Sequence, residues 1–132
     1  MPALPGALHS AEEATPHPRE DIYVMNANGS ELKRLTTNPA ADFDSSWSPD
    51  GTKIVFRREP QGALPDIFVM QPDGSAQTQL TRAGGERPVW SPDGQFILFS
   101  GNGLYVMNAD GSAITPLPTP GVKPSVLVDW TR

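Results

Sequence analysis

Few residues of this chain have side chains suited to nucleophilic or acid–base catalysis. A serine-type hydrolase needs a nucleophile, a base and a third group that orients the base. The only histidines are His9 and His17, and the sequence contains no Gly-x-Ser-x-Gly motif. Both histidines lie in an N-terminal segment that carries no other motif. We therefore predict that this chain is not itself an enzyme.

Asp42 and Asp44 resemble the start of a calcium-binding loop. An EF-hand beginning at Asp42 would need Gly at its sixth position and Glu at its twelfth, where the chain has Trp47 and Lys53. The sequence also lacks cysteine, which excludes disulfides and thiolate metal ligands, and it has no Gly-rich phosphate-binding loop. We predict no metal and no cofactor, and interpret the two aspartates as flanking the start of a strand.

Two other patterns allow both a functional and a structural interpretation. Asn28 begins an Asn-Gly-Ser triplet, which fits a glycosylation acceptor but is also part of a recurring turn. The tryptophans Trp47, Trp90 and Trp130 could stack on sugars or bases. Their recurring place in the repeats favours packing between neighbouring repeats.

The bulk composition argues against several classes of partner. The chain of 132 residues has a formal net charge of −5 and no basic stripe, so we expect no nucleic-acid partner. No apolar run approaches the roughly 20 residues that span a bilayer. Residues 1–20 lack the basic and apolar regions of a secretory signal and are predicted to be a disordered lead-in.

Two motifs recur along the chain. Residues 47–51 and 90–94 both read Trp-Ser-Pro-Asp-Gly, 43 residues apart. Residues 21–25, 66–70 and 103–107 share a second pattern, Asp-Ile-Tyr-Val-Met in its first copy, and each copy is followed by a turn that ends in Gly-Ser. A repeat of forty-odd residues is typical of four-stranded propeller blades.

The runs between these turns predict antiparallel strands. They are short, rich in β-branched and aromatic residues, and joined by turn sequences such as Ser-Pro-Asp-Gly and Asn-Gly. We predict an all-β chain, a partial β-propeller with two complete four-stranded blades and orphan strands at both ends. Its parts are a C–D hairpin at 21–36, blades at 43–81 and 88–118, and an orphan A strand at 126–130 within a domain spanning 21–132.

The two motifs together resemble the WD40-like (PD40) β-propeller repeats of the TolB family. The resemblance covers residues 21–130 and implies a TolB-type propeller, commonly six-bladed and often found outside the bacterial cytoplasm. Closed propellers use about four to eight blades, and this chain supplies fewer than three. We therefore expect part of a larger propeller, or a chain that self-associates through its open blade faces.

Variable loops on a rigid scaffold are the usual place for binding. In a meandering blade the A–B and C–D turns lie on one rim, and the B–C and D–A loops, which differ between the repeats, lie on the other. We predict a partner-binding surface on this second rim. Its candidate residues are Asp42, Arg58, Glu59, Arg82, Glu86 and Arg87.

Three functional hypotheses are consistent with these features. The first is a non-enzymatic module that acts as a scaffold and binds another protein. The second is the gating or substrate-admitting propeller of a serine peptidase-type hydrolase whose catalytic domain is absent from this chain. The third is a structural element without a ligand, in which the charged loop residues are simply solvated.

Overall fold

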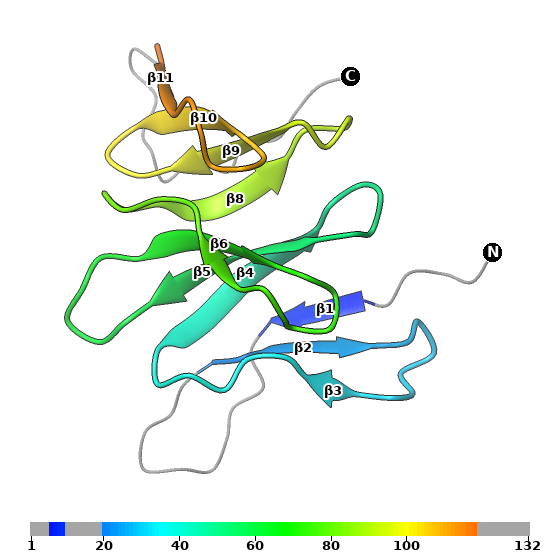
Figure 1. Ribbon diagram of the computed structural model, residues 1–132. Coiled ribbons are helices and arrows are strands. Elements are labelled where there is room, and N and C mark those ends of the chain that lie inside the picture. Colours follow the sequence, from blue (N-terminus) through cyan, green and yellow to red (C-terminus); the bar gives the residue numbers. More distant parts are fainter. Residues whose placement is uncertain (1–5, 10–19, 119–132) are drawn as a thin grey trace.

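The computed structural model describes residues 6–9 and 20–118, and every regular element within these ranges is a β-strand (Figure 1). The strands form three antiparallel sheets, with strand orders β1-β2-β3, β4-β5-β6-β7 and β11-β10-β9-β8. Their bounds are β1 Gly6–His9, β2 Ile22–Met25, β3 Lys33–Arg34, β4 Ala41–Trp47, β5 Ile54–Glu59, β6 Asp66–Met70, β7 Thr78–Gln79, β8 Glu86–Trp90, β9 Phe96–Ser100, β10 Leu104–Asn108 and β11 Thr115–Leu117. The predicted all-β meander is confirmed.

The two four-stranded sheets are the complete blades, and we call them blade 2 (β4–β7) and blade 3 (β8–β11). Equivalent residues pair in the same way in both: Phe56 lies opposite Phe68 in blade 2, and Phe99 lies opposite Tyr105 in blade 3. The first strand of each blade is interrupted by a bulge next to its second strand. Asp44 and Arg87 lie within these bulges and share a positive φ of 55° and 54°.

The first sheet corrects the prediction for residues 1–20. Strand β1 lies inside the segment predicted as a disordered lead-in and pairs antiparallel along all of β2, from Gly6 opposite Met25 to His9 opposite Ile22. The C–D hairpin predicted at residues 21–36 is therefore part of a three-stranded sheet, which we call blade 1. In it, β1 takes the place of a B strand. The pairing satisfies the second edge of β2, which would otherwise expose unpaired backbone groups. The predicted orphan strand at 126–130, with Trp130, lies outside the described residues.

Apolar side chains fill the spaces between the blades. The first interblade core joins blades 1 and 2 and consists of Ile22, Val24, Leu35, Ile54, Phe56 and Met70, with Trp47 and Phe68 packed against it. The second interblade core joins blades 2 and 3 and consists of Val55, Ile67, Val69, Leu80, Trp90, Ile97, Phe99 and Met107, with Tyr105 and Ala109 packed against it. Strand β6 alternates between the two cores, so blade 2 is apolar on both faces.

The two tryptophans of the repeat occupy equivalent positions, as predicted, but differ in burial. Trp47 lies opposite Ile54 and Trp90 lies opposite Ile97. Trp90 is buried, and its indole Nε1 donates a hydrogen bond to the Ser46 carbonyl of blade 2 at 3.2 Å. Trp47 is only half-buried, and its Nε1 has no hydrogen-bond partner among the described residues. Ser46, which accepts the hydrogen bond from Trp90, lies on β4, and the described part of blade 1 includes no strand at the equivalent position.

The Ser-Pro-Asp-Gly turns are held by their own side chains. In the turn after β4, Asp50 Oδ1 accepts hydrogen bonds from the Ser48 hydroxyl at 2.7 Å and from the Thr52 hydroxyl at 2.7 Å. These bonds, that from Ser48 foremost, lower the pKa of Asp50 to about 2. In the copy after β8, Ser91 donates in the same way to Asp93, whose pKa is also lowered.

The glycines of the C–D turns connect successive blades. Gly29, Gly74 and Gly111 have φ values of +85°, +87° and +89°. A Cβ atom on Gly74 would lie 2.8 Å from the carbonyl oxygen of Leu35 in blade 1, whereas one on Gly29 would meet no atom within 4 Å. The turn of each later blade therefore packs directly on the Leu-Thr segment of the blade before it.

Candidate binding site between two blades

The connections between strands lie on two opposite sides of the blades (Figure 1). The A–B and C–D turns lie on one side. The other side, which we call the loop rim, is formed by the B–C and D–A connections. These are residues 35–40, 60–65, 80–85 and 101–103.

Two of the six predicted partner-binding residues form an ion pair inside blade 2. Asp42 lies on β4 directly opposite Arg58 on β5, and Arg58 Nε and Nη2 contact the two Asp42 oxygens at 2.8 and 3.0 Å. Asp42 is fully buried and also accepts a hydrogen bond from Asn38 Nδ2 at 2.8 Å. Both carboxylate oxygens are thus used within the blade, and Asp42 offers no surface to a partner.

The Arg58 guanidinium closes the space between blades 1 and 2 at the loop rim. It lies 4.5 Å from the centroid of the Phe68 ring and 5.3 Å from that of Phe56. Its Nη2 also donates to Gln77 Oε1 at 2.8 Å. One arginine therefore covers a stacked aromatic pair, since the Phe56 and Phe68 centroids are 5.8 Å apart at an interplanar angle of 28°.

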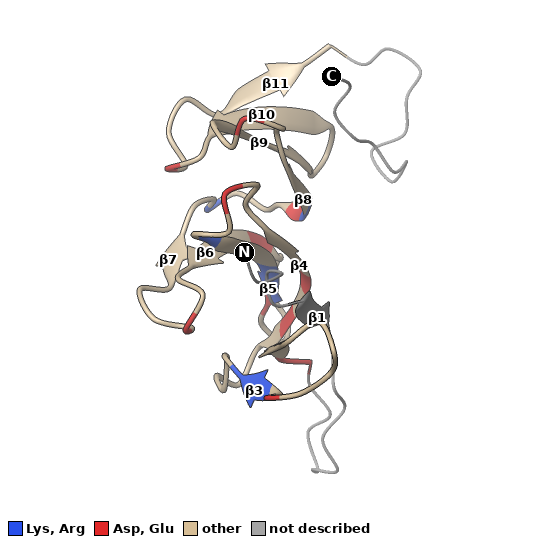
Figure 2. Cartoon of the chain, turned by 90° about the vertical axis from the view of Figure 1, so that its right-hand side faces the viewer, with Lys and Arg blue, Asp and Glu red and all other residues tan. Residues whose placement is uncertain are grey.

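Glu59 and Glu86, also predicted, meet at Arg57. Arg57 lies 2.5 Å from Glu59 Oε1 and 3.0 Å from Glu86 Oε2, and its guanidinium stacks over Phe43. Burial opposes the charge of Arg57 most strongly, but the hydrogen bond and charge of Glu59, aided by Glu86 and Asp44, raise its pKa. Figure 2 shows acidic residues of β4 next to basic residues of β5. Because Glu86 begins β8, the network ties blade 2 to blade 3.

Arg82 and Arg87 are the exposed members of the predicted set. Arg87 lies in the bulge of β8. Arg82 lies in the D–A connection that joins the two complete blades, and no carboxylate forms an ion pair with it within residues 20–118. The structure thus divides the predicted surface into an internal part and an exposed part, and partner binding by these residues stays a prediction.

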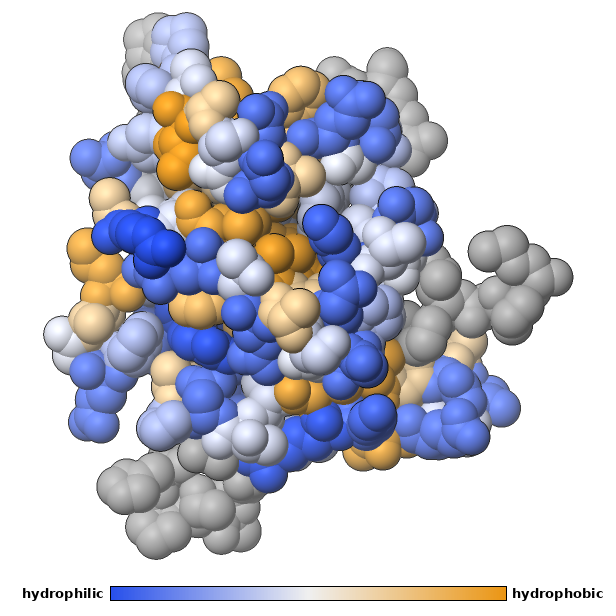
Figure 3. Space-filling view, viewed as in Figure 1, coloured by the Kyte–Doolittle hydropathy of each residue, from blue (hydrophilic) through white to orange (hydrophobic). Residues whose placement is uncertain are grey.

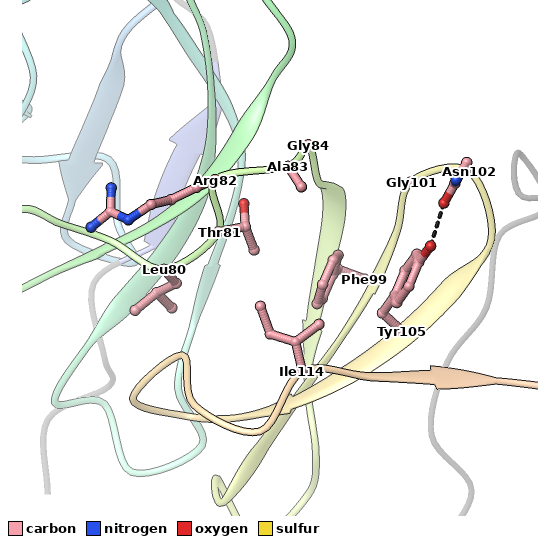
Figure 4. A pocket seen from close by; sticks show the side chains of 10 residues that line it. All are labelled: Leu80, Thr81, Arg82, Ala83, Gly84, Phe99, Gly101, Asn102, Tyr105 and Ile114. Atoms are coloured by element: carbon pink, nitrogen blue, oxygen red, sulfur yellow. Dashed lines mark hydrogen bonds between the residues drawn. The ribbon is translucent and has the colours of Figure 1, made fainter.

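An open pocket of about 490 Å³ lies at the loop rim between blades 2 and 3. We call it the interblade pocket. Its lining consists of residues 80–84 from blade 2 and of Phe99, Gly101, Asn102, Tyr105 and Ile114 from blade 3. Figure 4 shows Leu80, Ile114, Phe99 and Tyr105 arranged around it, with Arg82 extending from the blade 2 side. Figure 3 shows apolar surface where these two blades meet.

The interblade pocket is the counterpart of the space that Arg58 fills. Phe99 and Tyr105 stack with centroids 5.4 Å apart at 18°, as Phe56 and Phe68 do in blade 2. The residue that follows β9 at the position of Arg58 is Gly101, 43 residues later. With no side chain there, Tyr105 of the second aromatic pair stays partly exposed, while Phe99 is buried in the second interblade core. This site was not predicted from the sequence, although comparing the repeats position by position would have shown the change from Arg to Gly.

The hydroxyl groups of the pocket are engaged in structural hydrogen bonds. Thr81 Oγ1 donates to Asp66 Oδ1 at 2.7 Å and accepts from the Ile67 backbone amide at 3.0 Å. The Tyr105 hydroxyl donates to Asn102 Oδ1. Residues 6–9 and 20–118 include no group of three side chains placed to hold a metal ion, and none of their elements is a helix that could cross a bilayer.

Stacked, four-stranded antiparallel blades joined as a meander define a partial β-propeller. The chain belongs to the TolB beta propeller domain family, which matches residues 7–108. The match begins within the segment that contains β1, in agreement with the added strand.

The relatives are bacterial and longer than this chain. The uncharacterized protein Atu1656 of Agrobacterium fabrum is 28% identical over 116 residues, which make up 83% of this chain and 39% of that protein. The uncharacterized peptidase YuxL of Bacillus subtilis is 37% identical over 79 residues, 58% of this chain and 12% of that protein. The crystal structure of TolB from Acinetobacter baumannii shares the fold with a TM-score of 0.71 at 23% identity, covering 85% of this chain and 30% of TolB.

Proposed function

We propose that this chain is a non-enzymatic propeller module that binds another protein at its loop rim. The observation that carries the proposal is the interblade pocket, an open and largely apolar recess at a position that Arg58 closes in the preceding repeat. An apolar recess with a few polar groups at its edge is the usual form of a recognition site. The rim residue Arg82 supplies an exposed charge next to it.

The arrangement of the pocket supports binding rather than catalysis. Its two stacked rings and Ile114 offer contact surface, and its hydroxyl groups are held in structural hydrogen bonds. Thr81 bonds to Asp66 and to the Ile67 backbone amide, and Tyr105 bonds to Asn102. A serine-type mechanism also needs a base that a third group orients, and the pocket lining includes no histidine.

A second function is a propeller that admits substrates to a peptidase. The observation that favours it is the 37% identity to a protein named as an uncharacterized peptidase, over 79 residues. In that case the loop rim would contact many different peptides in passing, whereas a scaffold would hold one partner.

Site-specific photo-crosslinking tests both proposals. p-Benzoylphenylalanine placed at Ala83, which lines the pocket, is compared with the same group at Ala27, an exposed turn residue on the opposite rim. A protein-binding scaffold gives one discrete protein adduct from position 83 and none from position 27. A substrate gate gives a heterogeneous set of peptide adducts from position 83. Equal adducts at both positions, or none, would refute a binding role for the loop rim.

A further inference from the structure

We propose that the interblade pocket binds an apolar, preferably aromatic, side chain of a protein partner, and that a carboxylate next to that side chain pairs with Arg82. The inference rests on the proposed protein-binding function and specifies its ligand. It follows from comparing two equivalent positions in one chain, one filled by the protein itself and the other open.

The filled position shows what this geometry holds. The Arg58 guanidinium lies against the Phe56–Phe68 pair and is held by two acceptors, Asp42 and Gln77. A flat group seated on stacked rings at the mouth of an interblade core is therefore compatible with the fold. The interblade pocket keeps the ring pair and lacks the occupant.

The open position has lost the features that select a cation. The counterparts of Asp42 and Gln77 are Gly85 and Ile114, which have no side-chain acceptor. No acidic residue lines the pocket. A cation entering it would lose its hydration without gaining a partner, which is costly. An apolar group meets no such cost.

The walls favour an apolar group of some size. Ile114 is 45% exposed although it is a large hydrophobic residue, and it lies beside Phe99, facing Leu80 of blade 2. Leu80 forms the floor on the blade 2 side. An aromatic side chain between them would bury this surface and could stack on Tyr105, an arrangement that adds to the energy of area burial.

Arg82 would fix the orientation of the ligand by pairing with a carboxylate. It is the charged residue of the pocket lining, and it extends from the blade 2 side away from the aromatic pair (Figure 4). A carboxylate adjacent to the apolar anchor would reach it, whereas a lysine or arginine at that place would be repelled. The expected ligand is thus an acidic residue beside an aromatic one in a partner's chain.

Defined dipeptides test this assignment by amide chemical-shift titration, read at Gly84 and Tyr105. The probes are acetyl-Asp-Phe-amide, its neutral analogue acetyl-Asn-Phe-amide, acetyl-Asp-Ala-amide and acetyl-Arg-amide. We expect acetyl-Asp-Phe-amide to saturate with a dissociation constant on the order of 1 mM, typical of so small a ligand. Acetyl-Asp-Ala-amide and acetyl-Arg-amide should bind at least tenfold more weakly.

Gly101→Arg restores the residue found in the preceding repeat and should fill the pocket. A Cβ at Gly101 would contact only Tyr105, at an ordinary 3.6 Å, so the site accepts a side chain. We expect at least a tenfold loss of affinity for acetyl-Asp-Phe-amide, while Gly101→Ala keeps it. If Gly101→Arg does not fold, Ile114→Lys at the exposed wall should give the same loss. Arg82→Ala should weaken acetyl-Asp-Phe-amide roughly two- to fivefold, as for an exposed ion pair, and leave acetyl-Asn-Phe-amide unchanged.

Several outcomes would overturn the inference. Tighter binding of acetyl-Arg-amide would show that the pocket still selects a cation, and equal binding of acetyl-Asp-Ala-amide would remove the aromatic anchor. The absence of saturable shifts with every probe would remove the pocket as a side-chain site. A discrete adduct at position 83 without dipeptide binding would refute this ligand and keep the scaffold function. Dipeptide binding without any adduct would keep this ligand assignment and refute the scaffold function.

Discussion

The contact between the C–D turns and the preceding blade leads to a sharp prediction for Gly74→Ala. A left-handed backbone costs a residue with a Cβ about 1–2 kcal/mol. The new methyl group would also lie 2.8 Å from the Leu35 carbonyl oxygen, which belongs to the backbone and cannot rotate away. Overpacking of this kind costs roughly 1–3 kcal/mol, so the total destabilisation should be about 2–5 kcal/mol. Gly29→Ala should show only the backbone cost.

Urea unfolding followed by circular dichroism measures the difference. With an m-value of about 2 kcal/mol/M, Gly74→Ala should lower the midpoint by roughly 1–2.5 M and Gly29→Ala by roughly 0.5–1 M. Gly111→Ala should fall between them, because its Cβ would lie 3.1–3.3 Å from atoms of Leu80. Equal losses for Gly29→Ala and Gly74→Ala would refute the reasoning, since they would mean either that Leu35 yields freely or that another surface covers Gly29.

Four further predictions concern stability and assembly. Trp90→Ala should cost about 3–5 kcal/mol in the free energy of unfolding, and more than Trp47→Ala, because only Trp90 is buried and hydrogen-bonded. Equal costs in chemical denaturation would contradict this. Arg58→Ala should cost about 3–5 kcal/mol by leaving a buried carboxylate unpaired, and the double variant with Asp42→Ala should cost less than the sum of the two single changes in a thermodynamic cycle. The lowered pKa of Asp50 makes its turn contribute stability that is present above pH 4 and is lost as the pH falls towards about 2. Asp50→Asn should therefore flatten the acid limb of the stability profile relative to wild type, and an unchanged limb would argue against it. Since repeat units need about three or more copies for a continuous core, the 132-residue chain should self-associate in sedimentation at micromolar concentration, and a compact, highly stable monomer would show otherwise.

The repeated motifs carried enough information to predict the blades. The predicted blades at 43–81 and 88–118 each correspond to one observed four-stranded sheet, β4–β7 and β8–β11. The recurrence also placed Trp47 and Trp90 at equivalent registers. Such agreement is expected where turn chemistry and apolar patterning indicate the same structure. Strand β1 was not predicted because residues 6–9 do not repeat the β-branched runs of the other B strands.

The ion pair between Asp42 and Arg58 within blade 2 was not foreseen from the sequence. The predicted blade began at residue 43, whereas β4 begins at Ala41 and β5 ends at Glu59. Charged residues next to a strand end are mostly exposed, so both were assigned to the exposed rim as candidate partner-binding residues. Their direct opposition on β4 and β5 depends on the register around the bulge, which the local sequence does not reveal.

The pattern of similarity between blades 2 and 3 indicates where function can vary. On the side formed by the A–B and C–D turns, substitutions are restricted because Gly74 and Gly111 pack on the backbone of the blade before them. At the loop rim, Arg58 covers the Phe56–Phe68 pair, whereas Gly101 leaves the equivalent Phe99–Tyr105 pair without such a cover, and both arrangements are compatible with the blade. An apolar core lies beneath the rim at both blade junctions. Glycine at position 101, where the preceding repeat has Arg58, therefore leaves a pocket while the core of that junction stays packed. A fold of this kind can therefore open a pocket at one blade junction when Arg58 and its acceptors Asp42 and Gln77 are replaced by residues that leave the space unfilled.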